Sequence, residues 1–175
     1  MLAPLPPIDP TTLVVGIGNK ARHGKDSLGS MLLSALNLTG LFAKRYSFAD
    51  ELYLECKRDH GMTEKDAPLL QRVGLERRSE DPLYWIRKVW TKIAEDRPAI
   101  AIITDCRFVN EADTVRDSGG LVVRITRYND DGSMFLAPDR PADHPSEVEL
   151  DAYAPDVEVV NIGSLDQLWP DALNV

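Results

Sequence analysis

One stretch near the start of the chain limits the fold more than any other. Residues 13–17 are apolar and rich in β-formers, and a basic, glycine-punctuated stretch follows, up to Lys25. From Asp26 onward, the apolar residues are spaced to share one face of a helix; they are Leu28, Met31, Leu32 and Leu36. A buried strand, a glycine loop and a helix, in that order, predict the opening of a βαβ unit.

The loop in this unit has the composition of a phosphate-binding loop. Such a loop needs residues that tolerate left-handed backbone, a lysine that reaches the phosphates, and a helix that starts at once. Gly24, Lys25 and the predicted helix meet these needs. We therefore predict that ATP binds here, with Lys25 catalytic; the predicted contacts are Asn19, Lys20, Ala21, Arg22, His23, Gly24, Lys25, Asp26 and Ser27. The alternative is an ordinary glycine-rich turn.

Two positions depart from the usual G-x-x-x-x-G-K-[ST] pattern. Asn19 replaces the first glycine, and Asn is one of the few other residues that tolerate a positive φ. Asp26 replaces the Ser or Thr that would contact Mg²⁺, and Ser27 follows it. Either side chain is therefore a candidate metal ligand, directly or through water.

The rest of the chain alternates short strands with helices. Predicted strands cover residues 42–48, 99–104, 121–126 and 157–161. Predicted helices cover residues 50–58, 68–78, 109–118 and 164–173, and a further helix starts at residue 82 with an apolar stripe that reaches Ile93. Asp81 and Pro82 are typical of a helix start, and Gly119-Gly120 of a helix end. This order predicts an α/β fold of the three-layer P-loop NTPase type. Its five-stranded sheet would be mostly parallel, with helices on both faces and a lid.

Composition sets broader bounds. With 175 residues, 43% of them hydrophobic, we expect a short arm over residues 1–10 and one domain over residues 11–175. A net charge of −8 argues against a nucleic acid polymer as partner, although a few convergent basic groups can still bind a small anion. We expect neither a membrane helix nor a signal peptide. Cys56 and Cys106 show no C-x-x-C spacing, so a reducing cytoplasm is the expected location.

A further candidate centre follows the strand at residues 99–104. The strand ends in Asp105, and in P-loop enzymes such a carboxylate holds Mg²⁺ or its waters. The alternative is an aspartate that caps the next turn. Arg107 lies beyond the carboxyl end of the strand, where ligands of open α/β sheets bind. We predict that Arg107 is catalytic and clamps a phosphate, or that it pairs with Asp105 or Glu111.

The polar, aperiodic stretch over residues 128–145 is typical of a lid or binding loop, and we place the lid at about residues 127–147. Arg127 and Arg140 flank it; they are candidate catalytic residues, or else solvated loop residues. Asn161 and Ser164 follow the last predicted strand, where an adenine could bind.

Several blocks, in the right order, resemble the bacteriophage deoxynucleoside monophosphate kinases. They are Gly24-Lys-Asp-Ser27, Ser47-Phe-Ala-Asp50, Leu70-Gln-Arg-Val-Gly-Leu-Glu76 with Arg78, Pro82 and Trp85, Thr104-Asp-Cys-Arg-Phe-Val-Asn-Glu111, Gly119-Gly-Leu-Val-Val-Arg124 and His144-Pro-Ser-Glu147. The related phosphomevalonate kinases also carry Gly-Lys-Asp. The departures are Asn19, Leu75 where the family tends to have Thr, and a shortening by one residue before Pro82.

The resemblance implies an ATP- and Mg²⁺-dependent kinase that converts a deoxynucleoside monophosphate to the diphosphate, as in phage deoxynucleotide biosynthesis. It places the acceptor region at about residues 50–95. Arg78 would bind the acceptor phosphate, Gln71 a base edge, and Trp85 would stack on the base or lie in the core; Asp50 is the fourth acceptor candidate. A kinase for another phosphorylated acceptor, such as phosphomevalonate, and a non-catalytic nucleotide-binding module remain alternatives. The oligomeric state stays open, a homodimer included.

Overall fold

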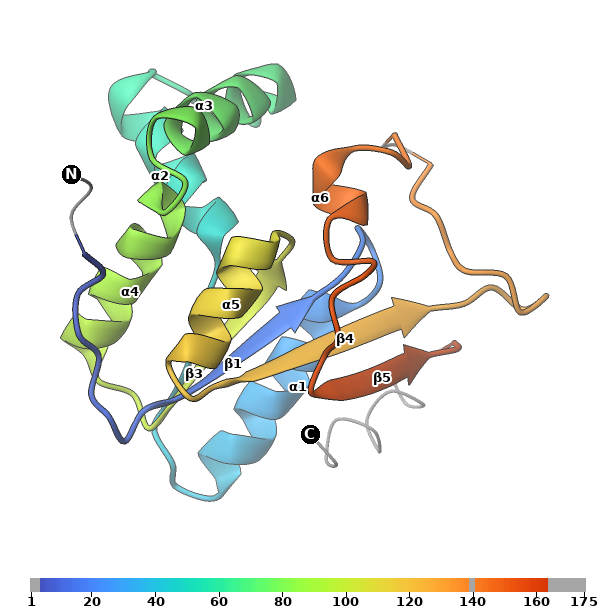
Figure 1. Cartoon of the computed structure of the whole chain (residues 1–175), viewed down its shortest axis with the longest axis horizontal. Helices are drawn as coiled ribbons and strands as arrows, with labels where there is room; N and C mark the ends of the chain where they lie inside the picture. The colour runs from blue at the N-terminus through green and yellow to red at the C-terminus, as the bar shows by residue number, and fades with distance from the viewer. Residues whose placement is uncertain (1–3, 139–140, 164–175) are drawn as a thin grey trace.

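The computed structural model describes residues 4–138 and 141–163 (Figure 1). The elements in chain order are β1 (Leu13–Gly18), α1 (Lys25–Leu38), β2 (Ala43–Tyr46), α2 (Phe48–Asp59), α3 (Ala67–Glu80), α4 (Tyr84–Asp96), β3 (Ile100–Cys106), α5 (Val109–Asp117), β4 (Leu121–Arg127), α6 (Pro145–Val148) and β5 (Val157–Asn161). The predicted helix over residues 164–173, together with Arg140 and Ser164, lies outside the described residues.

The strands form one five-stranded sheet within the described ranges, in the order β2-β3-β1-β4-β5. Every pairing is parallel, so the expected α/β sheet is confirmed. β1 lies at the centre, between β3 and β4, and its nearly continuous apolar sequence fits a strand covered on both faces. The loop that follows β1 therefore starts at the middle of the sheet's carboxyl edge, where ligands of open α/β sheets bind.

Helices cover both faces of the sheet (Figure 1). α1 contacts β1, β2 and β3, and α5 contacts β1 and β4. Successive residues of β1 point to opposite faces: Val14 belongs to the larger core cluster with α4 and α5, whereas Val15 packs with Leu28 and Leu32 of α1. The apolar stripe predicted for α4 is confirmed as core; it consists of Trp85, Ile86, Val89, Trp90 and Ile93.

The predicted start of α4 at Asp81 and Pro82 is wrong by two residues. Asp81 is the C-cap of α3, and α4 begins at Tyr84 after the N-cap Leu83. The residue before a proline is driven to extended backbone, which ends α3 at this point. The Asp81 carboxylate still accepts a hydrogen bond from the Leu83 amide, at 2.9 Å, and so bridges the turn. The predicted end of α5 is confirmed, with Gly119 at a positive φ of 78°.

The stretch predicted to lack structure is more ordered than expected. Tyr128 pairs with Met134 in an antiparallel bridge, and the Phe135 amide donates to Arg127 O at 2.9 Å. The short helix α6 follows, with the His144 side chain accepting from the Ser146 amide as its N-cap. Among the described helices, none is long and apolar enough to span a bilayer.

Candidate active site

The loop between β1 and α1 has the backbone expected of an anion-binding nest. Asn19, Arg22 and Gly24 adopt positive φ values of 127°, 61° and 104°. Left-handed residues interspersed in a short loop turn successive amides toward a common centre. Gly24 is also the N-cap of α1, so the amides of the first turn of α1 face the same space without intrahelical partners. The predicted strand, loop and helix thus occur in the predicted order.

Lys25 lies inside this loop. Its side chain is buried at 6% exposure, and Nζ donates to Asn19 O at 2.9 Å and to Lys20 O. The pKa of Lys25 is lowered to about 7; burial lowers it most and the nearby charge of Arg107 adds to this, while Glu147 and Asp105 oppose the shift. A cation that is desolvated in this way would gain strongly from a phosphate placed in the loop.

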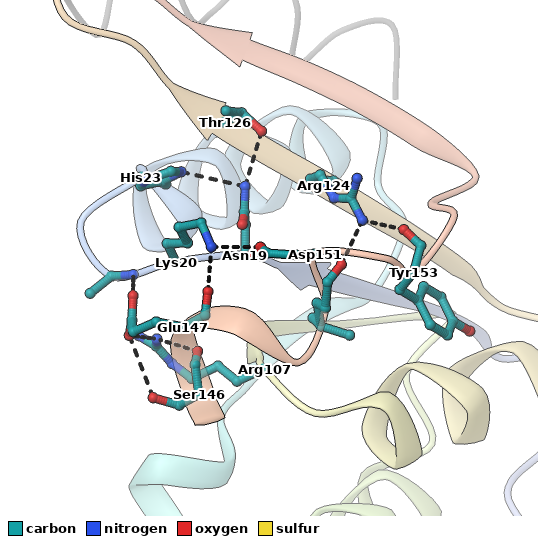
Figure 2. A network of polar contacts seen from close by, with 12 residues as sticks. Asn19, Lys20, His23, Arg107, Arg124, Thr126, Ser146, Glu147, Asp151 and Tyr153 are labelled. Carbon is teal, nitrogen blue, oxygen red and sulfur yellow. Dashed lines mark hydrogen bonds and ion pairs between the residues drawn. The ribbon is translucent and has the colours of Figure 1, made fainter. Parts of the chain in front are cut away.

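Two asparagine side chains fasten the loop to the sheet. Asn19 Nδ2 donates to Ile125 O at 2.9 Å and to Thr126 Oγ1 at 3.0 Å (Figure 2). Asn161 Nδ2 donates to His23 O at 3.0 Å. Both side-chain amides are therefore already hydrogen-bonded and hold the loop against the sheet, so they are not free to contact ATP as predicted.

His23 makes a similar support. Its ring is fully buried, Nδ1 accepts from the Arg127 amide at 3.2 Å, and Nε2 faces Phe135 O at 2.9 Å. This pattern fits a neutral ring protonated at Nε2, and burial lowers the pKa of His23 accordingly. The His23 ring points into the protein, so the predicted contact of His23 with ATP would have to come from its backbone amide.

The first half of the loop is attached to α6 and the residues after it. Lys20 Nζ binds Asp151 Oδ1 at 2.5 Å and also Glu147 O, and the Ala21 amide donates to Glu147 Oε2 at 2.7 Å (Figure 2). The Lys20 side chain therefore points toward α6, and the predicted contact of Lys20 with ATP would have to come from its backbone. Arg22, next along the loop, is exposed.

At the start of α1, Asp26 belongs to a small polar network, and its members Thr104 and Arg45 were not predicted as site residues. Its Oδ1 accepts from Thr104 Oγ1 at 2.9 Å and lies 3.8 Å from Arg45 Nη1. Arg45 Nη2 in turn binds Asp50 Oδ2 at 2.8 Å. The available signal was a charged residue, Arg45, inside the predicted strand over residues 42–48. Asp26 remains exposed, and Ser27 is half-buried beside it.

Asp105 is a helix cap in this structure. Its Oδ1 accepts from the Phe48 amide at 2.9 Å, and its Oδ2 accepts from the Ala49 amide at 2.8 Å and from Ser47 Oγ at 2.9 Å. These donors belong to the N-terminus of α2 and use three of about four lone-pair positions of the carboxylate. The prediction that Asp105 is a metal ligand is therefore not supported, and the capping alternative applies, although to a distant helix and not to the next turn.

Two predicted arginines converge on the loop after β3. Arg78 Nη2 binds Glu111 Oε1 at 2.7 Å, with its guanidinium 4.0 Å from the centre of the Phe108 ring. The Arg107 amide donates to Glu111 Oε2 at 2.8 Å, while Arg107 Nη1 pairs with Glu147 Oε1 at 2.7 Å. Glu111 thus joins Arg78 of α3 to the backbone of Arg107. The side-chain partner of Arg107 is Glu147, not the predicted Asp105 or Glu111.

The remaining acceptor candidates differ in exposure. Trp85 is buried at 2% exposure, and its Nε1 donates to Gly74 O at 3.3 Å, so a base cannot stack on it in this conformation. Of the two alternatives predicted for Trp85, the structure shows the one in which it lies in the core. Gln71 lies on the exposed surface of α3.

A hollow of about 420 Å³ lies at the carboxyl ends of β4 and β5. It is lined by Arg127, Tyr128, Asn129, Asp130, Asp131, Ile162 and Gly163. The Arg127 guanidinium lies 4.4 Å from the centre of the Phe135 ring, at one side of this region. The hollow adjoins Asn161, the place where the sequence predicts an adenine.

Within the described ranges, no three His, Cys, Asp or Glu side chains are grouped closely enough to hold a metal ion. This finding concerns sites in which protein side chains alone bind the metal ion. Mg²⁺ in nucleotide sites is usually held by one or two carboxylates together with waters and phosphates. Asp26 and Ser27 provide oxygen ligands of that kind at the mouth of the loop.

No family model matches the chain. The chain is similar to the deoxynucleoside-5'-monophosphate kinase of Escherichia phage T5, with 29% identity over 130 residues, or 69% of this chain and 50% of the relative. It therefore spans about half the length of that curated relative.

Among solved structures, a Chloroflexus aurantiacus protein described as a candidate kinase aligns over 94% of this chain and 95% of its own, with 12% identity and a TM-score of 0.50. A Mycobacterium tuberculosis APS kinase in complex with AMPPNP and APS aligns over 93% and 96%, with 13% identity and a TM-score of 0.49. Together with the all-parallel sheet, the Chloroflexus match supports the predicted α/β fold.

Proposed function

We propose that the chain is a nucleoside monophosphate kinase that transfers the γ-phosphoryl group of ATP to a deoxynucleoside monophosphate, giving the diphosphate and ADP. The observation that carries this proposal is the buried Lys25 ammonium inside a left-handed loop at the N-terminus of α1. The similarity to the phage T5 enzyme, over half of its length, favours the acceptor class.

The donor would lie on the loop. Amides of residues 22–26 and the positive end of α1 would bind the β and γ phosphates, and Lys25 would exchange its bonds to Asn19 O and Lys20 O for phosphate oxygens. Mg²⁺ would be held by Asp26 or Ser27, and when bound it offsets the charge on the phosphates. The hollow beside Arg127 and Ile162 is the candidate location for the adenine.

The acceptor would approach from the side of α2 and α3. Arg78 binds Glu111, which also accepts from the Arg107 amide, and the Arg107 guanidinium is held beside the phosphate loop by Glu147. An acceptor monophosphate bound there needs no general base, because its attacking oxygen is already anionic. Transfer then depends on in-line positioning and on cations near the developing charge. Closure of residues 127–147 over ATP would exclude water.

A coupled assay of ADP release tests the proposal. The panel contains every deoxy- and ribonucleoside monophosphate, with phosphomevalonate as a separate acceptor. We expect ADP release that requires a deoxynucleoside monophosphate and yields the matching diphosphate. Release with phosphomevalonate alone would indicate the other kinase class. ATP binding without acceptor-dependent turnover would indicate a nucleotide-binding module and overturn the proposal.

A further inference from the structure

We propose that Glu147 of α6 is a positioning residue for phosphoryl transfer: its carboxylate fixes Arg107 and the first half of the phosphate loop relative to each other. The inference rests on the proposed function. Oε2 accepts from the Ala21 amide at 2.7 Å, and Oε1 accepts from Arg107 Nη1 at 2.7 Å (Figure 2). One carboxylate thus bridges the segment after β1 and the segment after β3.

The backbone that carries Glu147 is itself held in place. Lys20 Nζ binds Glu147 O, and Arg124 Nη2 donates to Leu150 O at 2.8 Å. Leu150 is buried at 8% exposure in the larger core cluster, directly against Gly18, where an added Cβ would lie 3.0 Å from Leu150 Cδ1. The Glu147 side chain, buried at 7% exposure, is therefore presented by a fixed segment.

Charge explains why such a bridge is needed. Arg107 lies close enough to Lys25 for its charge to lower the lysine pKa, so the two cations repel each other. The Glu147 carboxylate opposes that effect on Lys25 and holds the Arg107 guanidinium by an ion pair. Without it, repulsion and hydration would draw Arg107 away from the loop. Displacement of a positioning group by about 1 Å can reduce turnover roughly 10²-fold.

The competing interpretation is that Glu147 occupies a phosphate position and must leave when ATP binds. Two observations favour positioning. The carboxylate contacts the loop at Ala21, whereas the amides at the positive end of α1 begin at Lys25. The anchoring of α6 through Lys20 and Leu150 also opposes its withdrawal. The two interpretations predict opposite changes in ATP affinity.

The test compares Glu147→Gln with Glu149→Gln. Gln keeps the shape of Glu147 but replaces one accepting oxygen with an NH₂ group, so it cannot accept from both donors. Glu149, two residues on, accepts from the Val109 amide at 3.0 Å and is exposed, which makes it the matched control. For each protein the measurements are kcat, KM for the acceptor, Kd for ATP, the melting temperature and the Ala21 amide signal by NMR.

For Glu147→Gln we expect kcat to fall roughly 10²-fold while Kd for ATP changes by less than about threefold. The Ala21 amide signal should shift in this variant only. ATP binding that becomes about tenfold tighter would show a competitor of phosphate and overturn the inference. Equal effects of the two variants, or a collapse of the melting temperature together with lost ATP binding, would also overturn it.

The two proposals fail in different ways. If the wild-type chain binds ATP but transfers phosphoryl to no monophosphate, the proposed function fails, and with it the role in transfer. The Ala21 shift specific to Glu147→Gln would then still support the bridge. If wild-type transfer is normal and Glu147→Gln turns over equally fast, only the positioning role fails.

Discussion

The phosphate loop and the segment over residues 127–138 and 141–153 (the facing segment) are in direct contact, yet the sequence specifies them in different ways. The loop follows from local sequence: a strand, left-handed positions at Asn19 and Gly24, a lysine and a helix. The facing segment has weak local signals, and its placement depends on distant partners, such as the Ala21 amide 126 positions away from Glu147. The phosphate loop can therefore be recognised from the sequence, whereas the distant groups that contact it, such as Glu147, cannot.

Because of this difference, we expect substitutions in the two regions to affect stability and turnover differently. A change at Lys25 should affect chemistry with little effect on folding, because its ammonium binds carbonyl groups of the loop itself, Asn19 O and Lys20 O. Changes in the facing segment should affect stability and chemistry together, since the same contacts hold the segment and reach the loop. The following variants test this contrast, starting with the largest expected effect.

Lys25→Ala should retain the fold but lose transfer by about 10²- to 10³-fold, the usual cost of removing one group that stabilises developing charge. The measurements are kcat in the coupled assay and the melting temperature. Lys44→Ala is the control, because Lys44 lies on β2 and its exposed side chain pairs with Asp96 at the end of α4. Normal turnover in Lys25→Ala would remove this lysine from the mechanism.

Leu150→Ala should lower the free energy of unfolding by about 2 to 3 kcal/mol, as expected for truncation of a buried leucine. It should also reduce kcat, because α6 would lose its anchor. Denaturant unfolding and the coupled assay measure the two effects. Val148→Ala, at a more exposed position of the same segment, should change neither quantity much. Loss of stability with unchanged kcat would separate α6 from the chemistry.

Asp105→Asn should cost about 1 to 2 kcal/mol of unfolding free energy, since an amide cannot accept all the hydrogen bonds that the carboxylate receives from the start of α2. As a helix cap, Asp105 should influence kcat by only a few-fold. If kcat instead falls strongly and excess Mg²⁺ reverses the loss, Asp105 is a metal ligand. Unfolding in urea and Mg²⁺ titration of the assay distinguish these outcomes.

His23 gives the smallest and most specific test, because it joins the two regions through the Arg127 amide and Phe135 O. Burial lowers its folded-state pKa, so its contribution to stability is present above the unfolded pKa of about 6.5 and is lost as the pH falls below that value. One proton can change stability by at most about 1.4 kcal/mol per pH unit. Unfolding at pH 7.5 and pH 5.5 should show this slope in the wild type and a weaker slope in His23→Gln. Equal slopes would contradict the assignment.

Local patterns predicted much of the fold. The apolar run of β1, the stripe of α4 and the glycines after α5 each depend on neighbours in sequence, and the structure follows them. The alternation of strands with helices was enough to predict a parallel sheet, because parallel strands need crossover connections.

The contacts that the sequence did not predict are those of side chains with distant partners. Asp105 caps a helix 57 positions away, through the Phe48 amide, instead of facing a metal. Lys20 turns to Asp151, and Arg107 turns to Glu147. Spacing along the chain does not encode such contacts, because they depend on which loops meet at the carboxyl edge of the sheet.

A crystal structure of the chain with AMPPNP and a deoxynucleoside monophosphate tests the central claim most directly. We expect the triphosphate to lie on the amides that follow β1, with Lys25 Nζ contacting its β and γ groups. The acceptor phosphate should lie beside Arg78 and Arg107. A triphosphate bound elsewhere, with Lys25 still bonded to Asn19 O, would contradict the account.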